Sequence, residues 1–510
     1  MSTPPSDPKA APAPSRSEPA TGLSPAVLDA LRAAVGVEGL LSDPDAQLPY
    51  VTEQRGNYRG RAALVVRPRS TAEVAEVARI LYAAGVAMVP QGGNTSLCGA
   101  STPSERGDEV VISLGRMNRV RALDAAGFTM TVEAGCVLAD LQAAAAEADR
   151  LFPLSLAAEG SCQIGGNLST NAGGTQVLRY GNTRELVLGL EVVLPDGRVL
   201  DLLRGLRKDN TGYNLVHLFC GAEGTLGILT AAVLKLFPRP RAVATALVAV
   251  RDLQAALELL ARARAATADG LTACEFIPRI ALEFVLRHIP GTREPLPRPY
   301  PYYLLLEAQD GGAADTDAAA PQQLGDRLGD RLGDRLDAQL GALLEQATAD
   351  GLVLDGVLAQ SPAQAAELWR LRESISEAQK PEGHSLKHDV AVPLGRLAQF
   401  VDEAAAAVQA AVPGVRVVAF GHVGDGNVHF NLSQPPDMPR AAFASERERL
   451  ARIVHDLAMA AGGSFSAEHG VGRLKRDELV RYRSPVELEI MRGIKRLFDP
   501  KGLMNPGKVL

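Results

Sequence analysis

Short apolar runs alternate with amphipathic segments between residues 62 and 245. Runs such as AALVVRP and TMTVEAG are rich in β-branched residues and predict strands. The segment TAEVAEVARILYAAG instead repeats its apolar residues at helical spacing. Pro195, Asp196 and Gly197 separate two further strand-like runs and predict a hairpin turn. This part of the chain is therefore expected to be an α+β module.

An amphipathic segment precedes this module. Residues 24–41 carry apolar residues at helical spacing, with Ser24 as the expected N-cap and Pro25 at the first helical position. Residues 1–22 are rich in Pro, Ala and Ser and lack the apolar core of a signal peptide. We predict a disordered tail over residues 1–22.

A second module begins after the Pro- and Arg-rich stretch FPRPRA at residues 237–242. Its first helix is predicted at LQAALELLARARAA. Further along, LGDRLGDRLGDRL places a leucine at every fourth position, and we interpret this repeat as a low-complexity extension of a surface helix. The expected domain limits are residues 23–240, residues 241–495 and a final segment, residues 496–510.

Charge and cysteine content exclude several classes of protein. The chain has 53 Lys and Arg against 59 Asp and Glu, a net charge of −6, so it lacks the basic excess of a nucleic-acid-binding protein. Its 5 cysteines include no Cys-x-x-Cys pair, which indicates a reducing compartment. No apolar run is long enough to cross a bilayer. We predict a cytoplasmic protein; peripheral association with a membrane and a homodimer stay open.

Glycine is abundant, with 49 among the 510 residues, and many of these glycines fall in three clusters. The clusters are PQGGNTSLCG from residue 90, EGSCQIGGNLSTNAGG from residue 159 and GAEGTLGI from residue 221. None has the G-x-G-x-x-G spacing of a Rossmann dinucleotide site. Loops of Gly with Asn, Ser and Thr can present backbone N–H groups to an anion. Three such loops in one module favour a large cofactor.

Two histidines and a glutamate in the second module suit a metal centre, and a third histidine lies next to the glutamate. RVVAFGHVGDGNVHFNL predicts a β-hairpin that turns at its DG pair, which sets His422 directly opposite His429, with Asn431 on the same face. Glu468 and His469 follow in SAEHGVGR. Two His and one Glu leave a fourth position open, as in catalytic zinc sites. Mn²⁺, Co²⁺ or Fe²⁺ would also accept such ligands.

Together these motifs point to a family. The three glycine clusters resemble the FAD-binding domain of the vanillyl-alcohol-oxidase type flavoproteins, also called PCMH-type. GHVGDGNVHFN, SAEHGVGRLKRDEL and FDPKGLMNPGKVL resemble the branch that contains D-2-hydroxyglutarate dehydrogenase, D-lactate dehydrogenase and the glycolate oxidase flavin subunit. The resemblance implies an α+β fold, in which a two-lobed FAD-binding domain precedes a cap domain with an antiparallel sheet flanked by helices.

The resemblance also implies which residues hold FAD. The first cluster would contact the pyrophosphate, the second would follow the ribityl chain and ring, and Asn505 would close the site. The first loop lacks the His to which relatives tether the flavin, so the FAD is expected to be non-covalent. The residues expected to bind it are Pro90, Gly92, Gly93, Asn94, Thr95, Ser96, Gly160, Gly165, Gly166, Asn167, Thr170, Asn171, Gly173, Gly174, Ile228 and Asn505.

For the metal centre, the resemblance assigns His422, His429 and Glu468 as ligands of Zn²⁺ or another divalent transition metal. His469 falls on the family's catalytic acid/base. The implied reaction oxidises a D-2-hydroxy acid to the 2-oxo acid: the metal acidifies the hydroxyl, His469 takes its proton and a hydride passes to flavin N5. The electrons would then leave to a flavoprotein, a quinone or a cytochrome.

Further positions bear on the choice of substrate. AQAAELWRLRESISEAQK predicts a helix with Arg372 and Ser376 four residues apart on one face, and Lys387 follows in SLKHDVAVPL. The resemblance implies that Arg, Thr and Lys at this spacing bind the carboxylates of D-2-hydroxyglutarate; here Ser376 replaces the Thr. Asn431 is expected to contact the same substrate. A charged fork and an ammonium favour this dicarboxylate over D-lactate or glycolate, which remain the alternative substrates.

Two other functions compete with this interpretation. A zinc hydrolase could use His422, His429 and Glu468 without a flavin, although the glycine clusters disfavour it. The chain could also bind FAD as a scaffold or electron conduit within a larger complex, although an intact His469 disfavours that role.

Overall fold

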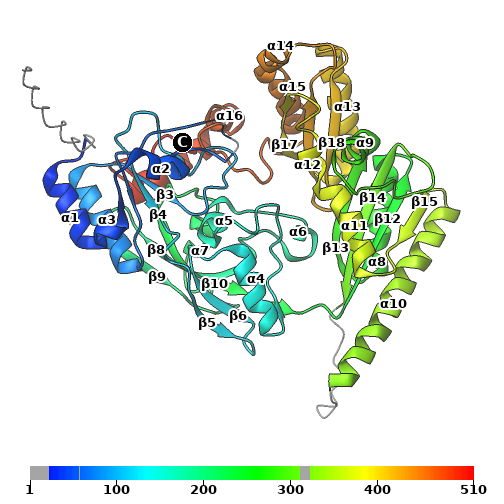
Figure 1. Ribbon diagram of the computed structural model, residues 1–510, viewed down its shortest axis with the longest axis horizontal. Coiled ribbons are helices and arrows are strands. Elements are labelled where there is room, and N and C mark those ends of the chain that lie inside the picture. The colour runs from blue at the N-terminus through cyan, green and yellow to red at the C-terminus, as the bar shows by residue number, and fades with distance from the viewer. Residues whose placement is uncertain (1–21, 55, 57, 311–321) are drawn as a thin grey trace, which may run out of the picture.

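The computed structural model describes residues 22–54, 56, 58–310 and 322–510, excepting the side chains of 322–332. Two lobes lie side by side: strands β1 to β10 belong to the first and strands β12 to β19 to the second (Figure 1). Both lobes combine helices with largely antiparallel sheets, so the predicted α+β class is confirmed. Within the described residues, no helix combines the length and the apolar character needed to cross a membrane.

The first lobe contains two main sheets. The smaller has the order β1-β2-β4-β3, in which β4 pairs in parallel with β2 and β3. The larger is antiparallel, with the order β5-β6-β10-β8-β9. Their strands are β1 (Leu40–Leu41), β2 (Leu64–Val66), β3 (Met88–Gln91), β4 (Val110–Ser113), β5 (Val120–Asp124), β6 (Thr129–Glu133), β8 (Val187–Val193), β9 (Val199–Leu202) and β10 (Ile228–Lys235); β7 (Arg150–Leu151) pairs with β11 (Phe237–Pro238).

Helices cover both of these sheets with their apolar faces. The first and third helices share a buried cluster with the smaller sheet, and the fourth, fifth and seventh share one with the larger sheet. The helices are α1 (Pro25–Val35), α2 (Pro44–Val51), α3 (Thr71–Ala84), α4 (Leu138–Glu147), α5 (Ile164–Thr170), α6 (Val177–Tyr180) and α7 (Leu215–Phe219).

The second lobe is built on one antiparallel sheet with the order β15-β12-β14-β13-β18-β19-β16, and β17 also pairs with β19. Burial of apolar residues on both of its faces explains why helices flank it on two sides. The strands are β12 (Ala242–Val250), β13 (Leu271–Pro278), β14 (Tyr302–Asp310), β15 (Val353–Leu358), β16 (Ser385–Leu386), β17 (Asp389–Ala391), β18 (Arg416–His422) and β19 (Asn427–Ser433).

One face of this sheet packs against α8 (Leu253–Ala266), α10 (Gln322–Ala349), α13 (Leu397–Ala411) and α15 (Arg447–Ala460). The other face packs against α9 (Arg279–His288), α11 (Pro362–Glu373) and α12 (Ile375–Ala378). A short α14 (Arg440–Ser445) precedes α15. The second lobe is therefore a sheet flanked by helices, as the resemblance implied.

The helices with the clearest periodicity lie where they were predicted. α3 and α8 coincide with the expected segments, and the predicted hairpin turn joins β8 to β9. Ser24 caps α1, since its Oγ accepts the Val27 N–H at 3.3 Å. The helix expected over residues 24–41 ends already at Val35, because Gly36 has a φ of 71° and stops it.

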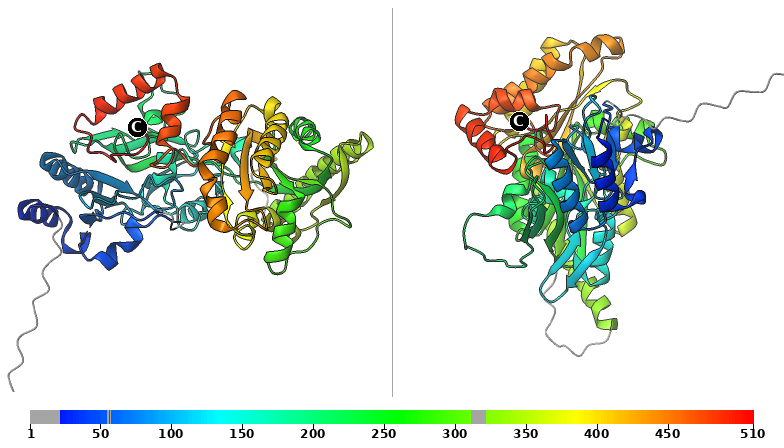
Figure 2. Two further views of the ribbon diagram at one scale, coloured as in Figure 1. Left: turned by 90° about the horizontal axis from the view of Figure 1, so that it is seen from above. Right: turned by 90° about the vertical axis from the view of Figure 1, so that its left-hand side faces the viewer.

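The C-terminal segment returns to the first lobe (Figure 2). α16 (Arg476–Tyr482) is followed by α17 (Pro485–Phe498), whose Phe498 ring meets the Phe219 ring with centroids 5.3 Å apart. Beyond it, Met504 bridges Met88 of β3, and the Asn505 N–H donates to the Met88 carbonyl at 2.7 Å. The end of the chain thus extends the sheet that carries the first glycine cluster.

Two sequence predictions fall largely outside the described residues. Of the disordered tail expected over residues 1–22, residues 1–21 are not described. The side chains of the LGDR repeat are not described up to residue 332. Within the described part of α10, Leu336 and Leu340 are buried against the sheet.

Candidate active site

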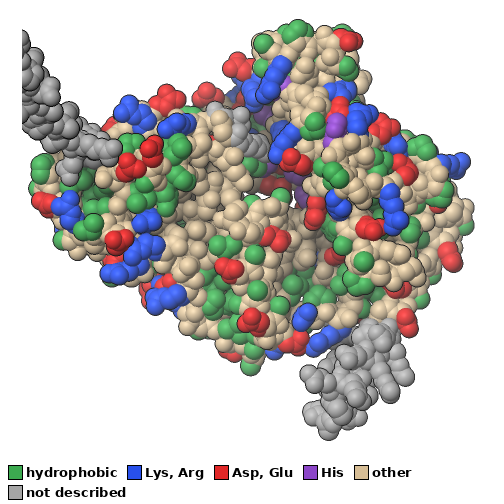
Figure 3. All heavy atoms as spheres, in the orientation of Figure 1, with side chains coloured by type: hydrophobic (Ala, Val, Ile, Leu, Met, Phe, Trp, Pro, Cys, Tyr) green, Lys and Arg blue, Asp and Glu red, His purple; other side chains and the backbone are tan. Residues whose placement is uncertain are grey.

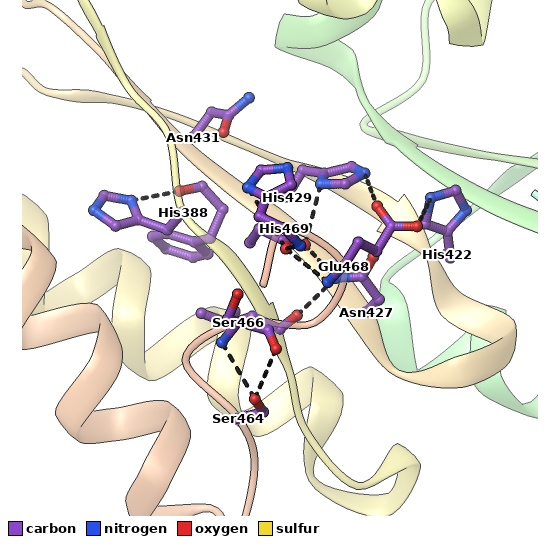
Figure 4. A network of polar contacts seen from close by, with 12 residues as sticks. His388, His422, Asn427, His429, Asn431, Ser464, Ser466, Glu468 and His469 are labelled. Carbon is purple, nitrogen blue, oxygen red and sulfur yellow. Dashed lines mark hydrogen bonds and ion pairs between the residues drawn. The ribbon is translucent and has the colours of Figure 1, made fainter. Parts of the chain in front are cut away.

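His422, His429 and Glu468 form a compact cluster. Each offers a ligand atom, and these atoms all lie within 4.8 Å of one another. His422 Nε2 is 3.8 Å and His429 Nε2 is 3.9 Å from the Glu468 carboxylate (Figure 4). Ligand atoms of a tetrahedral zinc, with bonds of about 2.1 Å, lie roughly 3.4 Å apart. The cluster therefore fits a divalent metal ion after a small contraction.

The surface is hollowed between the two lobes, and His side chains are visible in this hollow (Figure 3). His422 on β18 is only 7% exposed, so solvent has little access to the cluster from the side of the sheet. A substrate could reach such a site from the hollow.

The hairpin that carries both histidines has a different register from the predicted one. A turn of 3-10 helix, η3 (Val423–Asp425), joins β18 to β19, and Phe420 rather than His422 lies opposite His429. The prediction of a direct His422–His429 pair was wrong because η3 replaces the expected two-residue turn. The shift of two residues keeps His422 on the same face, and the two ring centroids are 5.3 Å apart.

Each of these histidines has a carboxylate beside its other ring nitrogen. His422 Nδ1 lies 2.8 Å from Glu275 Oε1. His429 Nδ1 lies 3.7 Å from Asp389 Oδ1. A carboxylate behind a metal-binding imidazole fixes the ring and its tautomer. Both Nε2 atoms are thereby directed toward Glu468.

These neighbours set the ionisation of the cluster. Burial lowers the pKa of His422, but Glu275 outweighs burial and raises this pKa to about 9. Burial and the charge of His422 hold the pKa of His429 well below its usual value. Burial raises the pKa of Glu468 to about 7. A metal ion would therefore have to displace a proton to bind at neutral pH.

Asp389 orients the loop that contains Glu468 and His469. Its Oδ2 accepts the backbone N–H groups of Glu468 at 2.8 Å and of His469 at 3.0 Å. His469 Nδ1 lies 3.6 Å from the same carboxylate. Burial opposes the ionisation of Asp389, but the charges of His469 and Lys475 outweigh it and hold its pKa far below the usual value. One buried carboxylate thus orients His469 through its Nδ1 side.

The glycine clusters of the first lobe come close to one another and to the metal cluster. A Cβ at Gly93 would lie 2.1 Å from the Ser161 carbonyl oxygen, so the first two clusters touch through backbone. A Cβ at Gly173 would lie 3.3 Å from Glu468 Oε1. The loops expected to bind FAD therefore meet the residues expected to bind metal.

Buried acceptors without partners line this region. Side-chain oxygens of Gln163, Asn167 and Asn505 are buried and have no hydrogen-bond partner among the described residues. Buried polar atoms in a complete site are nearly always hydrogen-bonded. These oxygens fit a ligand that donates hydrogen bonds, as the ribityl hydroxyls and the ring N–H of FAD do.

The other residues expected to bind FAD lie on the same loops or on the elements that border them. Ile228 begins β10, and the amide of Asn505 donates to the Ala100 and Glu223 carbonyls at 3.0 and 2.7 Å. On β3 and its loop lie Pro90, Gly92, Asn94, Thr95 and Ser96; on or before α5 lie Gly160, Gly165, Gly166 and Thr170; after α5 lie Asn171 and Gly174.

Glu223 ties the first lobe to the loop that contains His469. Its carboxylate accepts the backbone N–H groups of Val471 and Gly472, each at 2.7 Å. Burial raises the pKa of Glu223, although these two hydrogen bonds lower it. The residue lies in the third glycine cluster, so a loop expected to bind FAD also holds the loop that contains His469.

The residues expected to bind substrate occupy different environments. Arg372 is 7% exposed, and its Nε donates to Glu275 Oε2 at 2.8 Å. Ser376 is exposed on α12, and Lys387 is half-buried between β16 and β17. Asn431 is buried on β19, where its amide donates to the Gln379 side-chain oxygen at 2.8 Å.

The helix predicted to carry both Arg372 and Ser376 is not continuous. α11 ends at Glu373, and Ser374 caps both α11 and α12. The prediction of a single helix was wrong at this point, because serine disfavours helix interiors and favours helix ends. Arg372 and Ser376 therefore belong to different helices.

Sequence reasoning missed Glu275, Asp389, Gln163 and Glu223. Glu275 could have been found from one signal in the sequence, because it is the single charged residue in the apolar run LTACEFIP, which forms β13. A carboxylate at a buried strand position requires a partner. The other three residues stand in segments where polar residues are common, so no comparable signal marks them.

Comparison with known families settles the identity. Residues 239–509 match the family described as FAD linked oxidases, C-terminal domain, and residues 62–203 match the FAD binding domain family. The chain belongs to the FAD-linked oxidase family. It is an FAD-dependent hydroxy-acid dehydrogenase, with a small hydroxy acid as its substrate. A flavin-free hydrolase and a non-catalytic subunit are thereby set aside.

This FAD-linked oxidase is similar to several named dehydrogenases. It is 38% identical over 480 residues to a probable D-2-hydroxyglutarate dehydrogenase, mitochondrial, of Oryza sativa subsp. indica, covering 94% of this chain and 80% of the relative. It is 38% identical over 479 residues to D-2-hydroxyglutarate dehydrogenase of Xanthomonas citri pv. viticola, covering 94% and 96%. These relatives match nearly the whole chain.

Solved structures confirm the fold of this FAD-linked oxidase. Alkyldihydroxyacetonephosphate synthase superposes with a TM-score of 0.68 at 18% identity, covering 95% of this chain and 85% of that chain. p-Cresol methylhydroxylase superposes with a TM-score of 0.67 at 17% identity, covering 95% and 96%. The predicted PCMH-type architecture is therefore confirmed.

The predicted cytoplasmic location was wrong. The relatives from Oryza sativa, Arabidopsis thaliana and Bos taurus are named as mitochondrial proteins. The prediction rested on unpaired cysteines, which report a reducing environment and do not distinguish one reducing compartment from another.

Proposed function

We propose that this enzyme oxidises D-2-hydroxyglutarate to 2-oxoglutarate, using non-covalently bound FAD and a divalent metal ion, preferably Zn²⁺. The observation that carries the proposal is the meeting of Gly173, in a loop expected to bind FAD, with Glu468 of the metal cluster. A cofactor and a metal held at this junction would act on one substrate. The names of the relatives support D-2-hydroxyglutarate as that substrate.

Each part of the chain has a task in this proposal. Residues 23–240 hold FAD, residues 241–495 hold the metal and the substrate, and residues 496–510 close the FAD site. Cys162, in the second glycine cluster, is buried in the core, and burial raises the pKa of its thiol. A packed, protonated thiol supports non-covalent binding of the flavin.

The residues of the metal cluster divide the chemistry among themselves. When bound, FAD supplies a hydride acceptor, and the metal supplies a Lewis acid for the substrate hydroxyl. His422, His429 and Glu468 would hold the metal and leave a position for the substrate. His469 would take the hydroxyl proton at Nε2, since its Nδ1 faces Asp389 at 3.6 Å.

The substrate carboxylates would meet two kinds of positive group. Arg372 is balanced by Glu275, with Nη2 2.7 Å from the carboxylate, so it supplies oriented N–H donors rather than net charge. Lys387 would supply an ammonium group as the second positive group. A substrate with two carboxylates could bind to both positive groups, whereas D-lactate and glycolate have only one carboxylate. This favours a dicarboxylate as the substrate. The residues proposed to bind the substrate are Arg372, Ser376, Lys387 and Asn431.

Anaerobic reduction of the flavin tests this proposal. We expect the flavin absorbance of the purified protein to bleach with D-2-hydroxyglutarate and to stay unchanged with L-2-hydroxyglutarate. Treatment with EDTA should stop the bleaching while FAD remains bound, and Zn²⁺ should restore it. The electrons would then pass to a flavoprotein, quinone or cytochrome, which re-oxidation assays with each class would distinguish.

Two results would contradict parts of the proposal. Bleaching by D-lactate or glycolate, with none by D-2-hydroxyglutarate, would refute the dicarboxylate substrate. Full activity in a His422→Ala/His429→Ala variant would refute the proposed role of a metal ion in the reaction.

A further inference from the structure

Glu275 is a buried carboxylate in the middle of the second-lobe sheet. All eight residues of its strand, β13, are buried, and Glu275 itself is 1% exposed. In the pairing of β13 with β18, Glu275 lies directly opposite His422. The strand register therefore places this carboxylate beside the metal cluster rather than in the apolar core.

The two oxygens of Glu275 have different partners. Oε1 lies 2.8 Å from His422 Nδ1. Oε2 accepts Arg372 Nε at 2.8 Å and lies 2.7 Å from Arg372 Nη2. One carboxylate thus contacts both a residue assigned to the metal and a residue assigned to the substrate.

The contact with His422 decides which ring nitrogen faces the metal cluster. A carboxylate only accepts hydrogen bonds, so His422 Nδ1 must be the donor. The lone pair for a metal is then on Nε2, which lies 3.8 Å from Glu468 Oε1. Loss of the carboxylate would remove the group that selects this ring orientation.

The contact with Arg372 decides how the guanidinium lies. Its Cζ sits 4.9 Å from the centroid of the Phe420 ring, so the group is held between an aromatic face and Glu275. Nη2 is buried and, despite its closeness to Glu275, is not aligned for a hydrogen bond with any described residue. A buried donor of this kind is suited to a ligand carboxylate.

We propose that Glu275 is a positioning residue that orients the metal ligand His422 and the substrate-binding Arg372 together. This inference rests on the proposed function, because it needs a metal at His422 and a carboxylate substrate at Arg372. Glu275 touches neither the metal nor the substrate itself. It makes the geometry of one site depend on that of the other.

Glu275→Gln tests the effect on the metal. The amide keeps the size of the side chain but places an N–H group against either Arg372 or His422. We expect the Zn²⁺ affinity of the FAD-bound protein, measured by competition with a chromophoric chelator, to fall about 10- to 100-fold. Glu307→Gln is the matched control: Glu307 lies on the neighbouring strand β14 and accepts a hydrogen bond from Trp369 of α11 at 2.6 Å. Its Zn²⁺ affinity should equal that of the wild type.

The same variant tests the effect on the substrate. With Zn²⁺ saturating, we expect KM for D-2-hydroxyglutarate to rise about tenfold, because Arg372 loses its orientation. We expect kcat to change less, because His469 keeps its position. The visible spectrum of FAD and the thermal midpoint report whether the variant is folded. A general structural defect would alter the FAD spectrum and lower the thermal midpoint. It would also change KM and kcat together rather than mainly KM.

A double variant, Glu275→Gln/Arg372→Met, covers the case in which the single variant does not fold. It removes the cation that would be left buried beside an amide. Its Zn²⁺ affinity should remain as low as expected for Glu275→Gln. Wild-type Zn²⁺ affinity and KM in Glu275→Gln, or wild-type Zn²⁺ affinity in the double variant, would overturn the inference. Failure of the wild type to bind Zn²⁺ would instead overturn the proposed function and this inference with it.

Discussion

The histidines of this protein show how neighbours set the ionisation of one residue type. Glu275 raises the pKa of His422 to about 9 although burial lowers it. Burial lowers the pKa of His388 to about 3 and that of His455 to about 4. His388 Nδ1 lies 2.8 Å from the carbonyl oxygen of Phe430. This oxygen carries only a partial negative charge, so it raises the pKa of His388 less than burial lowers it, unlike the full charge of Glu275 beside His422. His388 and His455 are therefore neutral in the folded protein at mildly acidic pH.

We predict that His388 and His455 lower the stability of the protein as the pH falls from about 6.5 to about 4. In this range the unfolded chain binds protons at His388 and His455 and the folded chain does not. The free energy of unfolding should therefore fall by up to about 1.4 kcal/mol per pH unit for each histidine. Urea denaturation at a series of pH values measures the slope. His455→Gln should reduce it, and an unchanged slope in that variant would contradict the prediction.

At the scale of single residues, the proposed metal ligands stand out in the sequence, but the pairing of each ligand with the carboxylate beside it could not be predicted. His422, His429 and Glu468 stand in compact motifs whose residue types suit a metal. Glu275 is 147 residues from His422 in sequence, and Asp389 is 79 residues from Glu468. Strand pairing and loop packing bring each pair together, and a single sequence does not record those contacts.

The β18–β19 hairpin is the element that brings His422 and His429 into one site. Gly426 ends η3 with a φ of 80°, a conformation that favours glycine. A Cβ at this position would lie 2.2 Å from the Val392 carbonyl oxygen. The turn therefore packs against the segment that follows β17 and leaves no space for a side chain.

Gly426→Ala should disturb the metal cluster through this element. We expect a loss of stability of about 1–3 kcal/mol from the strained backbone, and a weaker Zn²⁺ affinity because the hairpin must move away from Val392. Chemical denaturation and chelator competition measure the two effects. Gly414→Ala is the control: Gly414 has a similar φ of 82°, but its Cβ would meet nothing closer than 3.6 Å. Equal Zn²⁺ affinity in the two variants would argue against the role of the turn.

The accuracy of the element predictions follows from what each pattern encodes. α3 and α8 have apolar residues at helical spacing and capping residues at their starts, Ser70 and Asp252, and both were predicted correctly. The β18–β19 turn was mispredicted because a DG pair also suits the end of a 3-10 helix. The break of α11 at Ser374 was missed because the preference of serine for helix ends is weak against the helical spacing around it.

In the whole molecule, the C-terminal segment links the two lobes. Asn505 has a φ of 47°, and its amide donates to the carbonyl of Ala100, directly after the first glycine cluster, and to that of Glu223 in the third. Glu223 in turn holds the backbone of Val471 and Gly472 from the second lobe. The loops expected to bind FAD and the loop that contains His469, the proposed base, are therefore connected by hydrogen bonds.

We predict that Asn505→Ala weakens FAD binding about tenfold or more. The substitution leaves the Ala100 and Glu223 carbonyls without their donor. It also removes Oδ1, which is buried without a partner among the described residues and is proposed to accept a hydrogen bond from FAD; the expected loss is about 1–3 kcal/mol. Flavin fluorescence on dilution measures the affinity for FAD. Asn210→Ala, at an exposed position of the first lobe, should retain wild-type affinity. Equal FAD retention in both variants would show that Asn505 does not close the site.

The fold of the whole molecule could be predicted because the motifs that resemble the family span both lobes. The return of the chain end to the first lobe could not be derived from periodicity or charge. It follows from contacts between Met88 and residues 503–505, which are far apart in the sequence. Only the resemblance had assigned Asn505 to the cofactor site.

The pairing of β3 with the C-terminal segment has a consequence for protein synthesis. β3 is the edge strand of its sheet, and Met504 covers that edge at Met88. The amide of Asn505 also meets Ala100, 405 residues earlier in the sequence. While the ribosome is still making the second lobe, the first lobe therefore has an exposed strand edge, and the site proposed for the flavin lacks Asn505. Such an edge can pair with other chains, so protection from aggregation and completion of the proposed flavin site both require that residues 503–505 have been synthesised.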